Sequence, residues 1–181
     1  IAALSPPNAH YTVQSAGNIP KGAPEVPFDD ALHSLSLQTQ KDWTKLLRDE
    51  GLKDPRFRIN DGSVEITSVI SLVLNSAGVR QLEKSCICSW GLMGMATEGN
   101  SLTSFDYFQW ISREASRVPE KLIQTTREFT KSVISGLTVG APTSYRGAVL
   151  FTPRAVIDNF LDGLSYHLNG RNLVEGTSRY G

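Results

Sequence analysis

Residues 63–74 read SVEITSVISLVL, and the fold of this chain depends on whether they form a helix or a strand. The spacing of one helix face, i, i+3, i+4, i+7 and i+8, is followed by Ile66, Val69, Ile70, Val73 and Leu74. Ser63 is a suitable N-cap, so the pattern predicts a helix here. A strand remains the alternative, because the run is rich in β-branched residues and the apolar residues Phe57, Ile59, Val64 and Ile66 flank a turn signal, Asn-Asp-Gly at 60–62.

The segments after this run are also predicted to be helical. Residues 79–96 carry apolar side chains at helical spacing, and Gly99-Asn100 would end that helix. Ser104 is a candidate cap for a helix that begins in the aromatic cluster at 105–110. Pro119 at a first helical position opens another helix, and a last one begins at Thr152-Pro153.

The sequence before residue 63 predicts one more helix and an extended arm. A helix is predicted from Asp29 or Asp30 to Glu50, with Gly51 able to terminate it. Residues 1–28 contain five prolines and no helical period, so we expect an extended arm. Spaced apolar residues suit this arm for docking on a neighbouring subunit or on its own domain: Ile1, Leu4, Tyr11, Val13, Ile19, Val26 and Phe28.

Together these segments predict a mainly α protein with a single helical-bundle core. We expect residues 1–28 to form the extended N-terminal arm, residues 29–164 the helical core domain and residues 165–181 the C-terminal arm, which has no apolar period. The alternative at the turn signal leaves room for one small β-hairpin.

Composition excludes several classes of protein. The chain has 181 residues, of which 40% are apolar and 20% charged, as in a globular domain. The strongest apolar stretch, residues 69–74, is far shorter than the roughly 20 residues of a membrane-spanning helix, so we expect no membrane contact. Eighteen basic residues balance eighteen acidic ones, but residues 1–111 carry a net charge of −3 and residues 112–181 a net charge of +3. This asymmetry is compatible with head-to-tail packing of subunits, with a polyanion near the second half, or with chance.

No motif for catalysis, a cofactor or a metal is recognised. Phosphate-binding loops and nucleophile elbows are absent from the sequence. The three histidines are scattered, and Cys86 and Cys88, predicted to lie on a helix, would point to different faces. We therefore expect reduced core cysteines, no metal, no cofactor and no enzyme activity.

Two motifs nevertheless carry a resemblance. Arg80-Gln81 is followed by Phe105-Asp106-Tyr107-Phe108, then by Ser112-Arg113, and then by Pro119 before a long predicted helix. In this order and local spacing, residues 79–135 resemble the coat proteins of flexuous filamentous plant RNA viruses, of the potyvirus and potexvirus type. In those proteins an Arg-Gln pair opens a core helix, and a Phe-Asp-Phe-aromatic motif comes later.

The resemblance implies a function and a site. The chain would be a viral coat protein that polymerises into a helical filament and encapsidates single-stranded RNA, found in the virion and the host cytoplasm. Its RNA-binding residues would be Arg80, on phosphate, with Asp106 and Arg113. The N-terminal arm would link identical subunits. From the residues alone two other readings remain open, a non-enzymatic helical adaptor or regulatory domain that binds protein partners through its arms, and an enzyme subunit with a dispersed site.

Overall fold

A computed structural model describes residues 17 and 28–180. The described chain divides into two units, one made of residues 17 and 28–141 and the other of residues 142–180.

The first unit is built on an antiparallel sheet. Its long strands β1 (Phe57–Leu74) and β2 (Arg80–Glu98) pair from Phe57 opposite Ala96 to Leu74 opposite Arg80. On the other side of β2 lies β4 (Asp106–Ser112), which pairs only with residues 88–94. The two-residue strand β3 (Ser101–Leu102) pairs with the end of β2. The central position of β2 makes it the strand on which the core is organised.

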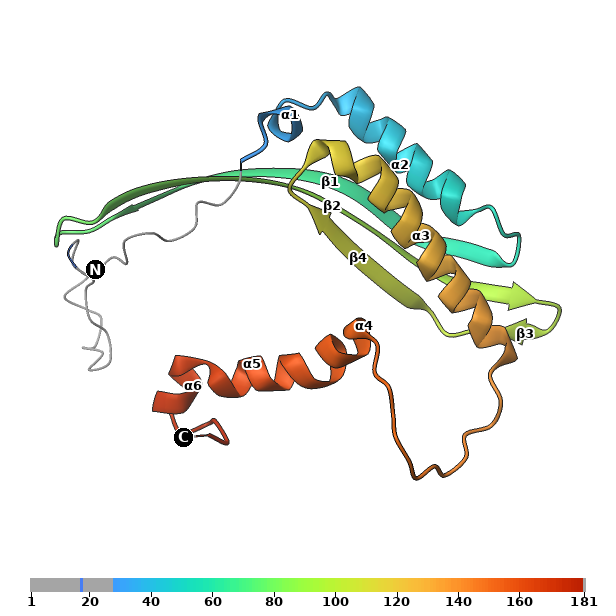
Figure 1. The fold of residues 1–181 in the computed structure, drawn as a ribbon. Coiled ribbons are helices and arrows are strands. Elements are labelled where there is room, and N and C mark those ends of the chain that lie inside the picture. Colours follow the sequence, from blue (N-terminus) through green and yellow to red (C-terminus); the bar gives the residue numbers. More distant parts are fainter. Residues whose placement is uncertain (1–16, 18–27, 181) are drawn as a thin grey trace. The chain divides into compact units, whose positions relative to one another are not determined.

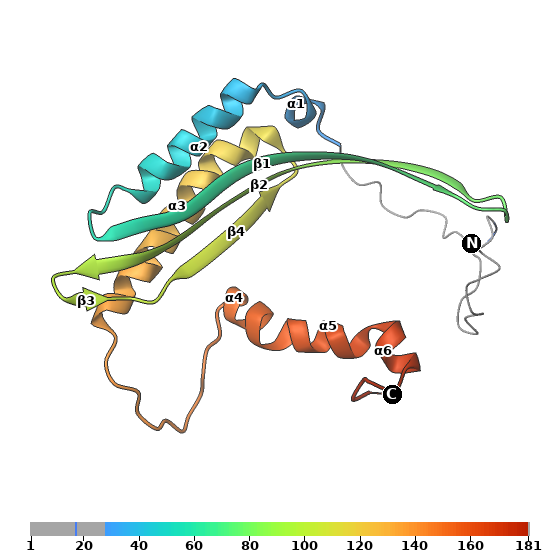
Figure 2. The ribbon, with the colours of Figure 1, turned by 180° about the vertical axis from the view of Figure 1, so that it is seen from behind.

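Helices cover one face of this sheet (Figures 1 and 2). They are α1 (Asp30–His33), α2 (Leu37–Gly51) and α3 (Val118–Ser135), with the short turns η3 (Ala115–Arg117) and η4 (Gly136–Thr138) beside α3. Asp29 caps α1, because one of its carboxylate oxygens accepts hydrogen bonds from the amides of Ala31 and Leu32. The other oxygen accepts the amide of Ala115 at 2.7 Å, which ties α1 to the entry of α3.

The core lies between these helices and every second residue of β2. Burial alternates from residue 85 to residue 97 of the strand, so that Cys86, Cys88, Trp90, Leu92 and Ala96 all face the helices. Trp90 is almost fully buried and donates its indole N–H to the hydroxyl of Thr125 on α3 at 3.0 Å. This bond satisfies the polar atom of the largest core side chain and connects α3 to the sheet.

The second unit is helical. It contains the contiguous segments α4 (Pro153–Val156), η5 (Ile157–Leu161) and α5 (Asp162–Leu168), followed by α6 (Gly170–Val174). Thr152 caps α4 by accepting the amide of Ala155, as its sequence predicted. The predicted start of a C-terminal arm at residue 165 falls inside α5, and α6 follows within the same segment.

The prediction of a mainly α protein with a single helical-bundle core is wrong. Two long segments read as helices, 63–74 and 79–96, are the two main strands, and the segment after Ser104 is β4. The apolar pattern of residues 79–96 fits both a helix and a strand. Leu82, Cys86 and Trp90 are four residues apart, which places them near one another on a helix, but residues an even number apart also share one face of a strand. The pairing of β2 with two other strands decided between the periods, and that is a non-local interaction.

The predicted turn at residues 60–62 is also wrong. These residues lie inside β1, where the pairing register skips Asn60 between Ile59 and Asp61. The turn-forming residues therefore make a β-bulge, not a reversal. Two helix predictions are confirmed: α3 carries Pro119 in its first turn, and the predicted helix from residue 29 or 30 to residue 50 exists, interrupted at residues 34–36 between α1 and α2.

Gly94 allows β1 to lie close to β2, so its substitution tests the sheet. A Cβ atom at this position would collide with the ring of Phe57 and the carbonyl oxygen of Arg58. We expect Gly94→Ala to lower the free energy of unfolding by about 1–3 kcal/mol, measured by urea denaturation. Gly140→Ala is the matched control, because nothing lies within 4 Å of the added atom. Equal stabilities of the two variants would contradict the observed pairing of β1 and β2.

Candidate assembly surfaces

The end of the β1–β2 hairpin extends past the helices that cover the rest of the sheet (Figures 1 and 2). We call residues 69–85 the hairpin arm. Its turn is closed by Asn75, whose side-chain oxygen accepts the amides of Ala77 and Val79, and by Gly78 in a positive-φ conformation. Because β4 reaches only as far as Cys88, the arm has two strands and two outer edges.

The helical cover ends just before the arm. Ser68 lies opposite Cys86, and their side chains are 3.2 Å apart. The hydroxyl of Ser68 is also 3.0 Å from Nδ1 of His33, the last residue of α1. Beyond this contact no helix of the first unit's described residues lies above the same face of the sheet (Figure 1).

The uncovered face of the arm is apolar. Side chains of alternate strand residues share a face, and facing pairs across the ladder share it too. The face that continues the core therefore carries four exposed apolar side chains: Ile70 (68% exposed), Leu72 (55%), Leu74 (60%) and Leu82 (60%). Arg80 and Lys84 are the charged residues on this face, whereas Glu83 points to the reverse. A two-stranded ribbon is at best marginally stable alone, so we expect the apolar side chains of this face to pack against another surface.

The second unit, taken by itself, has an apolar surface that its own described residues do not cover. We call residues 153–168 the terminal helix, which comprises α4, η5 and α5. Apolar residues recur on it every three to four positions and remain 37–58% exposed: Val156, Ile157, Phe160, Leu161, Leu164 and Leu168. A helix stabilised mainly by packing requires such a stripe to be buried.

The face of the sheet opposite the helices is a third candidate surface. The strand residues of β4 that point to it, Tyr107, Gln109 and Ile111, are exposed. Gly91 in β2 leaves a hollow of about 180 Å³ between the side chains of β1 and β4. Asp61 and Glu65 give the β1 part of this face a negative charge, which disfavours a polyanion.

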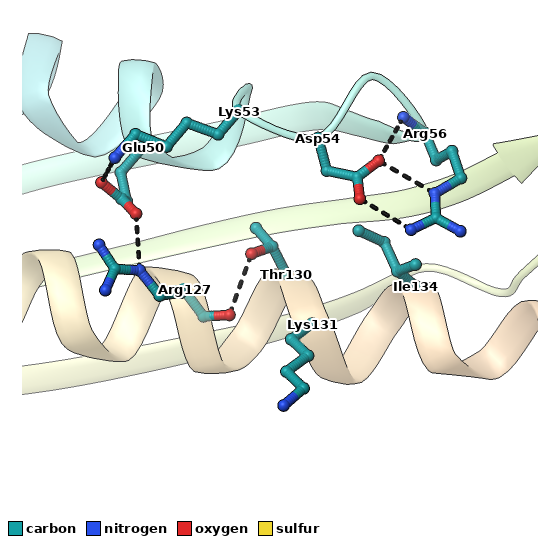
Figure 3. Close-up of a pocket in the computed structure, with 8 residues that line it drawn as sticks. All are labelled: Glu50, Lys53, Asp54, Arg56, Arg127, Thr130, Lys131 and Ile134. Carbon is teal, nitrogen blue, oxygen red and sulfur yellow. Dashed lines mark hydrogen bonds and ion pairs between the residues drawn. The ribbon is translucent and has the colours of Figure 1, made fainter.

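A pocket of about 320 Å³ between α2 and α3 contains an ion-pair network (Figure 3). The carboxylate of Glu50 is 4% exposed and lies 2.6 Å from Nζ of Lys53 and 3.0 Å from Nε of Arg127. At the other end of the pocket Arg56 donates two side-chain hydrogen bonds to Asp54 and lowers the pKa of that carboxyl to about 2. Each carboxylate is thus matched by a cation, and the ion pair between Glu50 and Arg127 fastens α2 to α3.

The structure does not bring the sequence-predicted RNA-binding residues together within one subunit. Arg80 begins β2 opposite Leu74, near the tip of the hairpin arm, whereas Asp106 begins β4 opposite Gly94. Fourteen positions along β2 separate these points, which corresponds to roughly 45 Å. Arg113 follows Ser112, which lies opposite Cys88 between the two.

The predicted subunit-contact arm falls mostly outside the described residues. Six of its seven apolar residues lie there: Ile1, Leu4, Tyr11, Val13, Ile19 and Val26. The seventh, Phe28, packs against the core of its own unit, with its ring 5.3 Å from that of His33.

The chemistry of the described residues is that of a packed core. Cys86 and Cys88 are free and buried, as predicted, but they lie on the same face of a strand, not on different faces of a helix. Burial, and to a smaller extent the neighbouring Cys86, raises the pKa of the Cys88 thiol to about 11, which keeps this thiol protonated at neutral pH. Within residues 17 and 28–180 no group of three or more metal-ligating side chains forms. No helix in this part of the chain is long and apolar enough to cross a membrane.

Comparisons with protein-family models, with curated protein sequences and with solved structures found no match to this chain.

Sequence reasoning missed the hairpin arm, although its signal is present. The β1 part of the arm has three β-branched residues, Val69, Ile70 and Val73, within a run that carries no charge from residue 66 to residue 79. Read at a period of two, the same residues are apolar on both sides of a strand, which is unusual for a solvated ribbon.

The ion-pair network predicts a pH dependence of stability. Burial raises the pKa of Glu50, but the hydrogen bonds and charges of Lys53 and Arg127 outweigh it and hold the pKa below its ordinary value of 4.5. The network therefore stabilises the folded protein above pH 4.5 and loses this effect as the pH falls through the lower, folded-state pKa. We expect Glu50→Gln to lower the free energy of unfolding at pH 7 by about 1 kcal/mol, since both cations are largely solvated.

Urea denaturation over a pH series measures this effect. The difference between wild type and Glu50→Gln should narrow as the pH is lowered below 4.5, because wild-type Glu50 then becomes neutral as well. Glu83→Gln, an exposed glutamate of the hairpin arm, is the control and should leave stability unchanged at pH 7. A difference that stays constant over the whole series would show that the network does not act through the charge of Glu50.

Proposed function

We propose that this chain is a non-enzymatic structural subunit that assembles with copies of itself, in the manner of a viral coat protein that forms a helical filament around single-stranded RNA. The observation that supports assembly is the hairpin arm, an apolar ribbon that extends past its own core. Within the first unit no helix packs on Ile70, Leu72 and Leu74, and leaving them in water costs about 25 cal/mol for each Å² of apolar surface. Contact with another molecule removes that cost.

An apolar arm favours a protein partner over a nucleic acid. Nucleic acids are held mainly through phosphate contacts from Lys and Arg. The arm has two cations and one anion in seventeen residues, and its largest surface is aliphatic. Aliphatic side chains neither pair with phosphate nor offer the ring faces on which bases stack. The arm is therefore assigned to contact between subunits.

The RNA-binding part of the proposal rests on the order of motifs between Arg80 and Pro119. Within one subunit Arg80 and Asp106 are too far apart to contact the same nucleotide. A shared contact would have to be made across a subunit boundary, where the arm of one copy carries Arg80 to the core of another. RNA binding is thus expected to depend on assembly.

The open face of the sheet favours a second candidate function, an adaptor domain that binds a different protein. Its hollow over Gly91 and its exposed Tyr107 and Ile111 would be the contact surface. Such a domain would remain monomeric by itself and would gain mass only when its partner is added.

Light scattering after size exclusion, with electron microscopy of the same fractions, separates the two functions. We expect the wild-type chain to form species larger than a monomer, and Ile70→Ser/Leu72→Ser to reduce the association constant at least about a hundredfold, because both side chains leave an apolar contact. Leu37→Ser/Leu102→Ser removes two equally exposed leucines from outside the arm and should assemble as wild type does.

Folding of each variant is checked by circular dichroism, and the substituted side chains are exposed in the subunit. A wild-type chain that stays monomeric at every concentration, with and without RNA, would contradict the proposed function. Normal assembly of the arm variant would remove the arm from the contact.

A further inference from the structure

We infer that the terminal helix of one copy packs on the uncovered face of the hairpin arm of a second copy, and that this single contact, repeated, builds an open polymer. The inference rests on the proposed function and specifies the interface that would produce it.

The two surfaces have matching shapes. The arm presents the continuation of the face on which α1, α2 and α3 pack in the core of the same sheet (Figures 1 and 2). Helices therefore already cover this face over residues 57–68 and 86–98, and an apolar helix stripe is the kind of surface that packs on it. The terminal helix supplies such a stripe, with Ile157, Leu161 and Leu164 exposed along it.

The lengths also agree. The terminal helix has sixteen residues, which corresponds to roughly 24 Å. The β1 part of the arm from Val69 to Leu74, with the turn beyond it, extends about 20–25 Å at the rise of a strand. One helix can thus cover the apolar side chains of one arm without leaving much of either surface in water.

The charges at the edges of the two surfaces are opposite. The arm face carries Arg80 and Lys84, and neither has an ion-pair partner within the described part of the chain. The terminal helix carries Asp158, which is 3.4 Å from Arg154, and Asp162, for which residues 17 and 28–180 offer no cation. Asp162 and Lys84 are therefore available for an ion pair between copies. Such a pair would favour this partner surface and this orientation over a partner surface that carries only apolar side chains.

The contact is heterologous, because it joins two different surfaces. Each copy has one arm and one terminal helix, so a copy bound through its arm still offers its helix to the next. Such an interface continues indefinitely unless its rotation closes a ring. It would thus explain filament growth from one interaction, without a two-fold axis between subunits.

A mixing experiment tests the inference on the full chain. The arm variant is Ile70→Ser/Leu72→Ser, and the helix variant is Ile157→Gln/Leu164→Gln, in which glutamine keeps the helix propensity high. We expect each variant alone to be monomeric. Mixed in equal amounts, they should form a dimer with twice the mass of either and no larger species. The intact terminal helix of the arm variant can bind the intact arm of the helix variant, and the dimer then has no second intact pair of surfaces through which to grow.

A charge exchange gives a second, independent measurement. Lys84→Glu should weaken assembly at least about tenfold, and adding Asp162→Lys to it should restore most of the loss. Lys45→Glu, an exposed lysine on α2, is the control and should have no effect.

The outcomes separate the inference from the proposed function. If the wild type assembles but the mixed variants remain monomeric, the inference is overturned and self-assembly stands. If the helix variant fails to assemble while the arm variant assembles normally, the helix binds another surface, such as the open sheet face, and the inference is again overturned. Mixed variants that stay monomeric and are both less stable than wild type would place the helix on the arm of its own chain. A monomeric wild type would overturn both.

Discussion

The antiparallel ladder between β1 and β2 is the interaction on which the rest of the structure depends. It is continuous from Phe57 opposite Ala96 to Leu74 opposite Arg80, interrupted only by the bulge at Asn60. One half of this ladder carries the core, because its alternating side chains are buried under α2 and α3. The other half is the hairpin arm. A single pairing therefore produces both a stable domain and a protruding apolar ribbon.

This division has a functional consequence. The core half is stabilised by non-local contacts such as the bond from Trp90 to Thr125 and the network around Glu50. The arm half has none of these helices above it, yet the apolar side chains continue along the same face. Such a ribbon suits the proposed assembly. The strand alternation that places apolar side chains in the core also places apolar side chains on one face of the arm, where a neighbouring subunit could contact them.

Several features could be predicted from the sequence because they depend on neighbouring residues. The cap at Thr152, Pro119 in the first turn of α3 and the buried free cysteines are local consequences of residue type. The sites were less predictable. The motif order that groups Arg80 with Asp106 assumes helices, whereas in the sheet Arg80 begins β2 and Asp106 lies opposite Gly94, fourteen positions further along that strand. The helical spacing of residues 66–74 and 79–96 predicts helices where the arm, which carries the proposed contact, is a strand pair.

The sequence by itself determined which residues are apolar, that helices begin near Asp29, Pro119 and Thr152, and that the chain contains enough apolar surface for a core. It did not determine whether 63–74 and 79–96 were helices or strands. Leu82, Cys86 and Trp90 satisfy a four-residue spacing, and Cys86, Cys88, Trp90 and Leu92 satisfy a two-residue one. Only tertiary structure decides between such patterns, because the hydrogen bonds of a strand are made with residues distant in sequence, here Phe57–Leu74 and Asp106–Ser112, and no local signal specifies that these partners will be present.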